Sequence, residues 1–105
     1  MEEVQVLGGN IQLVGFSQLD GGSMIILKKI VGGFVRDCSV QIPSFEQFSL
    51  KLNKMIRTPS GEGNTFVLES SIKFSGQEAK TEAESMNLFL ALDKALRDVR
   101  AKVTL

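Results

Sequence analysis

The sequence predicts a single two-layer α+β domain over residues 1–105, with a four-stranded, mostly antiparallel sheet covered on one face by two helices. Its 105 residues suit one domain and leave no room for a second. The spacing of apolar residues predicts the element order β-α-β-β-β-α. In the strand segments apolar and polar residues alternate, so one sheet face is expected to be wet and both helices must cover the other.

The first strand is predicted to begin at Val4 and to continue beyond Ile11. Apolar residues alternate with polar ones on both sides of the glycine pair Gly8 and Gly9. Glycine inside a strand is typical of a bulge, where the chain bends. We therefore expect one strand that is bent or bulged at this pair.

The first helix is predicted after Gly15, where the apolar spacing becomes helical. Either Ser17 or Ser23 is expected to cap its first turn, and Pro43 bars its continuation. The expected buried stripe consists of Leu27, Ile30, Val31, Phe34 and Cys38, with Lys28, Lys29, Gly32 and Arg36 on the other side.

The next three segments are predicted to be strands because their apolar residues recur at every second position. The second strand follows Ser44, and residues 58–64 form a turn-rich connection to the third. The residues expected to face the helices are Phe48, Leu50 and Leu52, then Phe66, Leu68, Ile72 and Phe74. A tight turn at Gly76 leads into the fourth strand, whose inward residues are small.

The second helix is predicted to follow a cap at Ser85 or Asn87. Its apolar residues recur at helical spacing, which indicates one buried face. That face is expected to consist of Leu88, Phe89, Leu92, Leu96, Val99 and Val103.

The composition argues against an enzyme. The chain has no histidine, which removes the commonest general base and the commonest metal ligand, so we expect no catalytic residue, metal or cofactor. Cys38 is the only cysteine and falls on the apolar stripe, so a buried hydrophobic role is expected for it. One cysteine, no signal peptide and no long apolar run predict a cytoplasmic protein without membrane attachment.

Basic residues of the two helices are the strongest candidates for a functional site. The chain is neutral, with 12 basic and 12 acidic residues, but the helical segments carry an excess of bases. The candidates for contacts with nucleic-acid phosphates are Lys28, Lys29, Arg36, Lys94, Arg97, Arg100 and Lys102. The alternative is a solvated helix face, balanced by neighbouring aspartates.

Three segments resemble the ribosome hibernation-promoting factors, also called ribosome-associated translation inhibitors. Residues 4–13 are similar to the family's opening I-x-I-x-G-x-x-I-x-L pattern. The stretch N-L-F-L-A-L-D at residues 87–93 is similar to its D-M-Y-x-A-I-D, and residues 76–83 match its last strand. The predicted β-α-β-β-β-α order agrees with that of the family over nearly the whole chain.

This resemblance implies a fold similar to that of double-stranded RNA-binding domains and a non-enzymatic role in translation regulation under stress. The implied partner is rRNA of the small ribosomal subunit, with Lys94, Arg97 and Arg100 as the residues that meet its phosphates. The chain departs from the family in its neutral charge, in Val14 where a Thr is common, and in the glycine pairs of the first helix. The alternative is a small protein-interaction module that forms a homodimer through its sheet.

Overall fold

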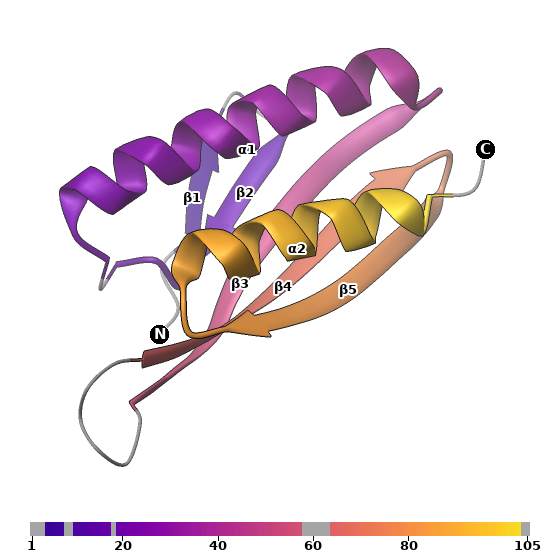
Figure 1. The fold of residues 1–105 in the computed structure, drawn as a ribbon. Coiled ribbons are helices and arrows are strands. Elements are labelled where there is room, and N and C mark those ends of the chain that lie inside the picture. Colours follow the sequence, from indigo (N-terminus) through magenta and orange to yellow (C-terminus); the bar gives the residue numbers. More distant parts are fainter. Residues whose placement is uncertain (1–3, 8–9, 18, 58–63, 104–105) are drawn as a thin grey trace.

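The computed structural model describes residues 4–7, 10–17, 19–57 and 64–103, with residues 54–57 and 64 described by their backbone alone. Two helices lie side by side over one face of a five-stranded sheet (Figure 1). The elements are β1 (Val4–Leu7), β2 (Ile11–Val14), α1 (Gly21–Gln41), β3 (Phe45–Arg57), β4 (Asn64–Phe74), β5 (Gln77–Ser85) and α2 (Leu88–Ala101). The predicted α+β class is confirmed.

The sheet is mixed, and the predicted four-stranded, mostly antiparallel sheet is wrong in detail. Its order is β1-β2-β3-β4-β5, with β2 parallel to β3 and the other neighbours antiparallel. The segment predicted as one bent strand is two strands, in which Val4 lies opposite Val14 and Leu7 opposite Ile11. Period-two alternation is the same in a bent strand and in a hairpin, so it could not separate them. Gly8 and Gly9 lie outside the described residues.

The strands β3, β4 and β5 form an antiparallel meander at the centre and one edge of the sheet. Most of the predicted connection at residues 58–64 lies outside the described residues, and β4 begins at Asn64. The predicted tight turn at Gly76 joins β4 to β5, where Phe74 pairs with Gln77. Ser75 and Gly76 both have positive φ, 48° and 73°, as the type I′ turn of a two-residue hairpin requires.

The hydrophobic core lies between the sheet and the helices. Phe48, Leu50, Leu68, Ile72 and Phe74 are buried as expected, whereas Phe66 is only partly buried. The helices contribute Leu27, Val31, Val35, Cys38, Leu88, Ala91, Leu92, Ala95, Leu96 and Val99. Ile30, expected in the buried stripe of α1, is 40% exposed. Val35 is buried instead. The side of α1 that packs on the sheet is therefore rotated about the helix axis relative to the side that the apolar spacing predicted.

The helix caps explain where each helix begins. Asp20 caps α1, and neither Ser17 nor Ser23 does. Its carboxylate accepts hydrogen bonds from the backbone N–H and the hydroxyl of Ser23, at 2.9 and 2.7 Å. In α2 the cap is Asn87, one of the two predicted residues, which accepts from the backbone N–H groups of Phe89 and Leu90.

Candidate functional site

All seven basic residues singled out in the sequence lie on the helix layer. Three are on α1, three on α2, and Lys102 directly follows α2. All are exposed except Arg100, which is partly buried. In the part of the chain that the structure describes, Lys28, Lys29, Arg36 and Lys94 form no ion pair. These four side chains therefore present uncompensated positive charge to solvent.

The other three basic residues are engaged by the protein. The Arg97 guanidinium lies 2.9 Å from the Asp93 carboxylate, one turn earlier on α2. Arg100 reaches across to α1, where its Nη2 donates to Oε1 of Gln41 at 3.5 Å. Lys102 turns the opposite way, and its Nζ donates to a main-chain oxygen of β5 at 3.2 Å.

The basic residues do not merge into one stripe between the helices. Because Arg100 contacts Gln41, the side of α1 that carries Gln41 faces α2. At 100° per residue, Ile30 and Asp37 lie within about 40° of Gln41, whereas Lys28 lies about 140° away. The facing sides therefore carry an apolar residue and an acid, and the lysines of α1 point elsewhere.

Charge is nevertheless distributed unevenly between the helix layer and the edge strand β5. Three basic residues and one acidic residue lie on α1, and α2 with Lys102 adds four basic and two acidic residues. The edge strand β5 carries three glutamates and one lysine. The helix layer is thus positive and the β5 edge negative, although the whole chain is neutral.

The helix layer also carries exposed apolar side chains that the sequence analysis did not single out. The largest exposures on the helices are those of Val40 at 82%, Leu90 at 63% and Ile25 at 60%, and Met86, just before the cap of α2, is 67% exposed. Ile26 and Ile30 on α1 are exposed as well. A signal was present in the M-I-I-L-K-K-I-V run at residues 24–31, because it holds more apolar residues than one helical stripe can bury.

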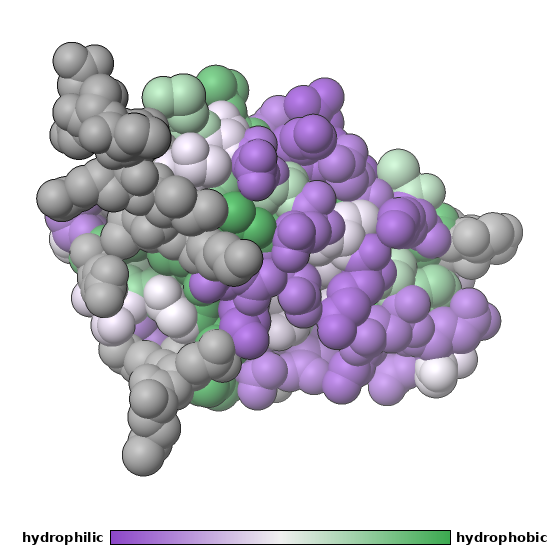
Figure 2. All heavy atoms as spheres, turned by 90° about the horizontal axis from the view of Figure 1, so that it is seen from below, coloured by the Kyte–Doolittle hydropathy of each residue, from purple (hydrophilic) through white to green (hydrophobic). Residues whose placement is uncertain are grey.

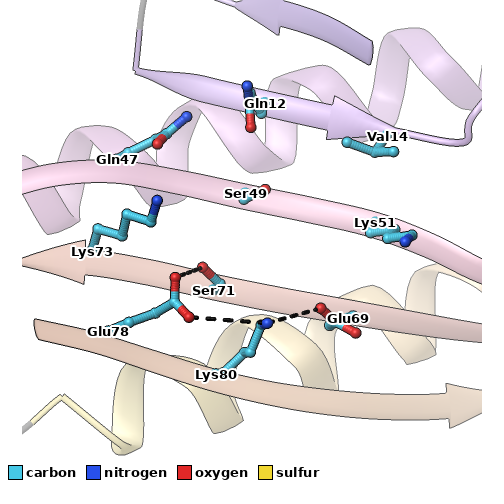
Figure 3. Close-up of a pocket in the computed structure, with 10 residues that line it drawn as sticks. All are labelled: Gln12, Val14, Gln47, Ser49, Lys51, Glu69, Ser71, Lys73, Glu78 and Lys80. Atoms are coloured by element: carbon cyan, nitrogen blue, oxygen red, sulfur yellow. Dashed lines mark hydrogen bonds and ion pairs between the residues drawn. The ribbon is translucent and has the colours of Figure 1, made fainter. Parts of the chain in front are cut away.

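The open face of the sheet, opposite the helices, holds a shallow depression of about 170 Å³ (Figure 3). Its lining comes from four neighbouring strands: Gln12, Val14, Gln47, Ser49, Lys51, Glu69, Ser71, Lys73, Glu78 and Lys80. The alternation of β3 and β4 had predicted a wet face here. The depression forms because short serine side chains lie at its centre and longer polar side chains surround them.

Hydrogen bonds and ion pairs occupy the carboxylates of this face. The Lys80 ammonium lies 3.5 Å from the Glu69 carboxylate and 3.9 Å from that of Glu78. Glu69 stands opposite Glu82 in the sheet, and the Asn53 amide donates to both carboxylates at 3.2 Å. The hydrogen bond from Asn53, followed by the nearby Lys80, holds the pKa of Glu69 below its usual range. Both acids of this cross-strand pair are thus satisfied as anions.

No catalytic or metal-binding group emerges from the described residues. Cys38 is buried in the core, and burial raises the pKa of its thiol, so the reactive thiolate is disfavoured. In residues 4–7, 10–17, 19–57 and 64–103, no three His, Cys, Asp or Glu side chains lie close enough to hold a metal ion. Neither described helix is long and apolar enough to cross a membrane.

No family model matches the chain, and no curated protein matches it at a significant level. A functional assignment therefore depends on the geometry of the molecule.

Proposed function

We propose that this protein is a non-enzymatic, cytoplasmic RNA-binding domain that associates with rRNA of the small ribosomal subunit and represses translation. The observation that carries the proposal is the exposed positive charge of the helix layer. Lys28, Lys29, Arg36 and Lys94 are held by no ion pair in the described part of the chain. Phosphate contacts supply most of the affinity in such complexes, and free ammonium and guanidinium groups supply those contacts.

Helix geometry supports an interface on the outer side of both helices. Lys29 is two residues from the buried Leu27, and Arg97 is two residues from the buried Val99. A two-residue step turns a side chain by about 160° around the helix axis, so both cations point away from the sheet. The helices lie side by side (Figure 1), so one RNA surface can meet cations from both.

The order of helices and strands also supports the proposal, because it agrees with the order that the resemblance to ribosome hibernation-promoting factors implies. With β1 set aside, β2, α1, β3, β4, β5 and α2 follow the order β-α-β-β-β-α that this resemblance implies. The N-L-F-L-A-L-D stretch begins at the cap of α2, and the basic residues of α2 follow it. A layout similar to double-stranded RNA-binding domains remains part of the proposal.

Pairing of two copies through the β5 edge of the sheet has weaker support. The edge strand β5 carries Glu78, Lys80, Glu82 and Glu84, and charged side chains on an edge strand oppose strand addition. Seen from below the view of Figure 1, the right-hand part of the surface is mainly hydrophilic (Figure 2).

The test is cosedimentation with purified small ribosomal subunits at several salt concentrations. Replacing Lys29 and Lys94, which form no ion pair in the described part of the chain, with glutamine should weaken binding. For duplex RNA, removal of each phosphate contact should lower the slope of log K against log salt by about 0.9. Folding should be unaffected, because exposed substitutions usually change stability by about 0.5 kcal/mol or less.

Lys73→Gln is the matched control, since Lys73 is an exposed lysine on the opposite face of the sheet. It should leave subunit binding unchanged. Equal weakening from both faces would indicate nonspecific attraction. Absence of wild-type binding at low salt, where phosphate contacts are least screened, would reject the proposed function.

A further inference from the structure

Unpartnered donors converge in the depression on the open face of the sheet. Four of its side chains have no hydrogen bond or ion pair in the described part of the chain: Gln12, Gln47, Ser49 and Lys73. They come from adjacent strands, where Gln12 lies opposite Ser49 and Gln47 opposite Lys73. Neighbouring strands are about 4.8 Å apart, so these donors can reach a common ligand.

Lys73 forms no ion pair in the described part of the chain, although Glu78 lies opposite it in β5. The Lys80 ammonium pairs with the carboxylates of both Glu69 and Glu78. The hydroxyl of Ser71 also donates to the Glu78 carboxylate, at 3.5 Å. Figure 3 shows the Lys73 side chain extending from β4 toward β3, where Gln47 and Ser49 lie. The ammonium group therefore points into the depression with its donors unused.

The chemistry of the four groups favours an acceptor-rich, negatively charged ligand. An ammonium group only donates hydrogen bonds, and hydroxyl and amide groups donate to oxygen acceptors. Charge-assisted hydrogen bonds to an oxyanion are about twice as strong as neutral ones. A volume near 170 Å³ is well below the range of about 300–1,000 Å³ that drug-sized ligands and cofactors occupy. The depression thus suits a single small anionic group.

We propose that the open face of the sheet binds a small molecule through an oxyanion, a phosphate or a carboxylate, held by Lys73, Ser49 and the amides of Gln12 and Gln47. The site lies on the opposite side of the sheet from the helices, so it is separate from the proposed RNA-binding surface. Phosphate and carboxylate groups both carry several acceptor oxygens on one negatively charged group.

The experiment is an NMR titration of isotope-labelled protein with inorganic phosphate and, separately, with sodium acetate. Sodium chloride keeps the ionic strength constant. Saturable shifts of the Gln12 and Gln47 side-chain amides and of the Ser49 backbone amide are expected with at least one anion, and the tighter of the two identifies the anion type. Lack of saturation by both anions at millimolar concentrations would overturn the proposal.

Two variants show whether the binding is specific. Lys73→Gln removes the charge-assisted contact and should raise the Kd by about tenfold. Glu84→Gln changes one charge at an exposed position of β5 outside the depression and should leave the Kd unchanged. Equal effects of the two variants, or none from Lys73→Gln, would reject the site. Because Lys73→Gln should leave ribosome binding intact, the two proposals can fail separately.

Discussion

The two helices pack on the same sheet in different ways. Beneath α2 the sheet presents small residues, Ser70, Ala79 and Ala83, and the helix adds Ala91 and Ala95, all buried. The Ser70 hydroxyl donates to the main-chain oxygen of Ala95 at 3.2 Å, so the helix backbone lies within reach of a strand side chain.

Beneath α1 the residues are large. The rings of Phe34 and Phe48 meet edge to face, with centroids 5.3 Å apart, and Leu13 and Leu50 are fully buried nearby in the same core. Side-chain volume thus sets the height of each helix above the sheet. The stability of the domain should therefore be most sensitive to smaller side chains beneath α1 and to larger side chains beneath α2.

Truncation of a buried side chain beneath α1 should cause the largest loss of stability. Phe48 is fully buried, so Phe48→Ala is expected to cost about 3–5 kcal/mol in the free energy of unfolding, measured by urea denaturation. Val40→Ala is the control, because Val40 is 82% exposed on the same helix layer. Similar midpoints for Phe48→Ala and the wild type would contradict the packing of α1 described above.

Enlargement beneath α2 should have the next largest effect. Ala95 is fully buried against β4, so Ala95→Leu is expected to destabilise the domain by about 1–3 kcal/mol through overpacking. Ala101→Leu adds the same atoms at an exposed position of α2 and should change little. If Ala95→Leu raised the melting temperature, space would have to exist between α2 and the sheet.

Removal of the α2 cap should cost less. Asn87 accepts from the backbone N–H groups of Phe89 at 2.9 Å and Leu90 at 3.1 Å, so Asn87→Ala is expected to cost about 1 kcal/mol. Asn87→Asp keeps an acceptor oxygen and should retain most of the stability. Equal destabilisation by both replacements, measured by thermal unfolding, would argue against capping.

A gain in stability is expected on α1. Gly33 is an exposed helical residue, and a Cβ there would meet no atom within 4 Å apart from its chain neighbours and the backbone of its own helix. Gly33→Ala should therefore stabilise the domain by about 0.5–1 kcal/mol. Gly15→Ala should do the opposite, because Gly15 has a φ of +81° and a Cβ there would lie 2.9 Å from the Leu52 main-chain oxygen. Unfolding curves of the two variants should shift in opposite directions.

The smallest expected effect is a pH response of the α1 cap that the α2 cap does not share. The hydroxyl and the backbone N–H of Ser23 hold the pKa of Asp20 below its usual range. A lowered folded-state pKa means that the cap contributes fully above the unfolded value of about 3.9 and is lost as pH falls through the folded value. The Ser23 amide signal should therefore titrate in acid, while the Phe89 amide, bonded to the neutral Asn87, should not. Parallel titration of both signals would contradict this difference.

The candidate site was only partly predictable. The seven basic residues are visible in the sequence, and helical spacing placed most of them on exposed sides. The contacts of Arg100 with Gln41 and of Lys102 with the main chain of β5 join residues 59 and 22 positions apart. The depression likewise draws its lining from four strands. No local pattern encodes such contacts, because they depend on how distant elements cross.

The sequence by itself determined the α+β class, the core face of β4, the turn at Gly76 and the face of α2, because each follows from a local period or a local backbone preference. Only the tertiary structure decided that residues 4–7 and 11–14 form two paired antiparallel strands, that Ile30 is exposed while Val35 is buried, and that α2 lies closer than α1 to residues of the sheet. Alternation specifies which residues share a strand face, but strand partners are chosen by pairing across the sheet. The orientation of α1 and the heights of both helices depend on side-chain volumes from strands distant in sequence, and these act only after the sheet has formed.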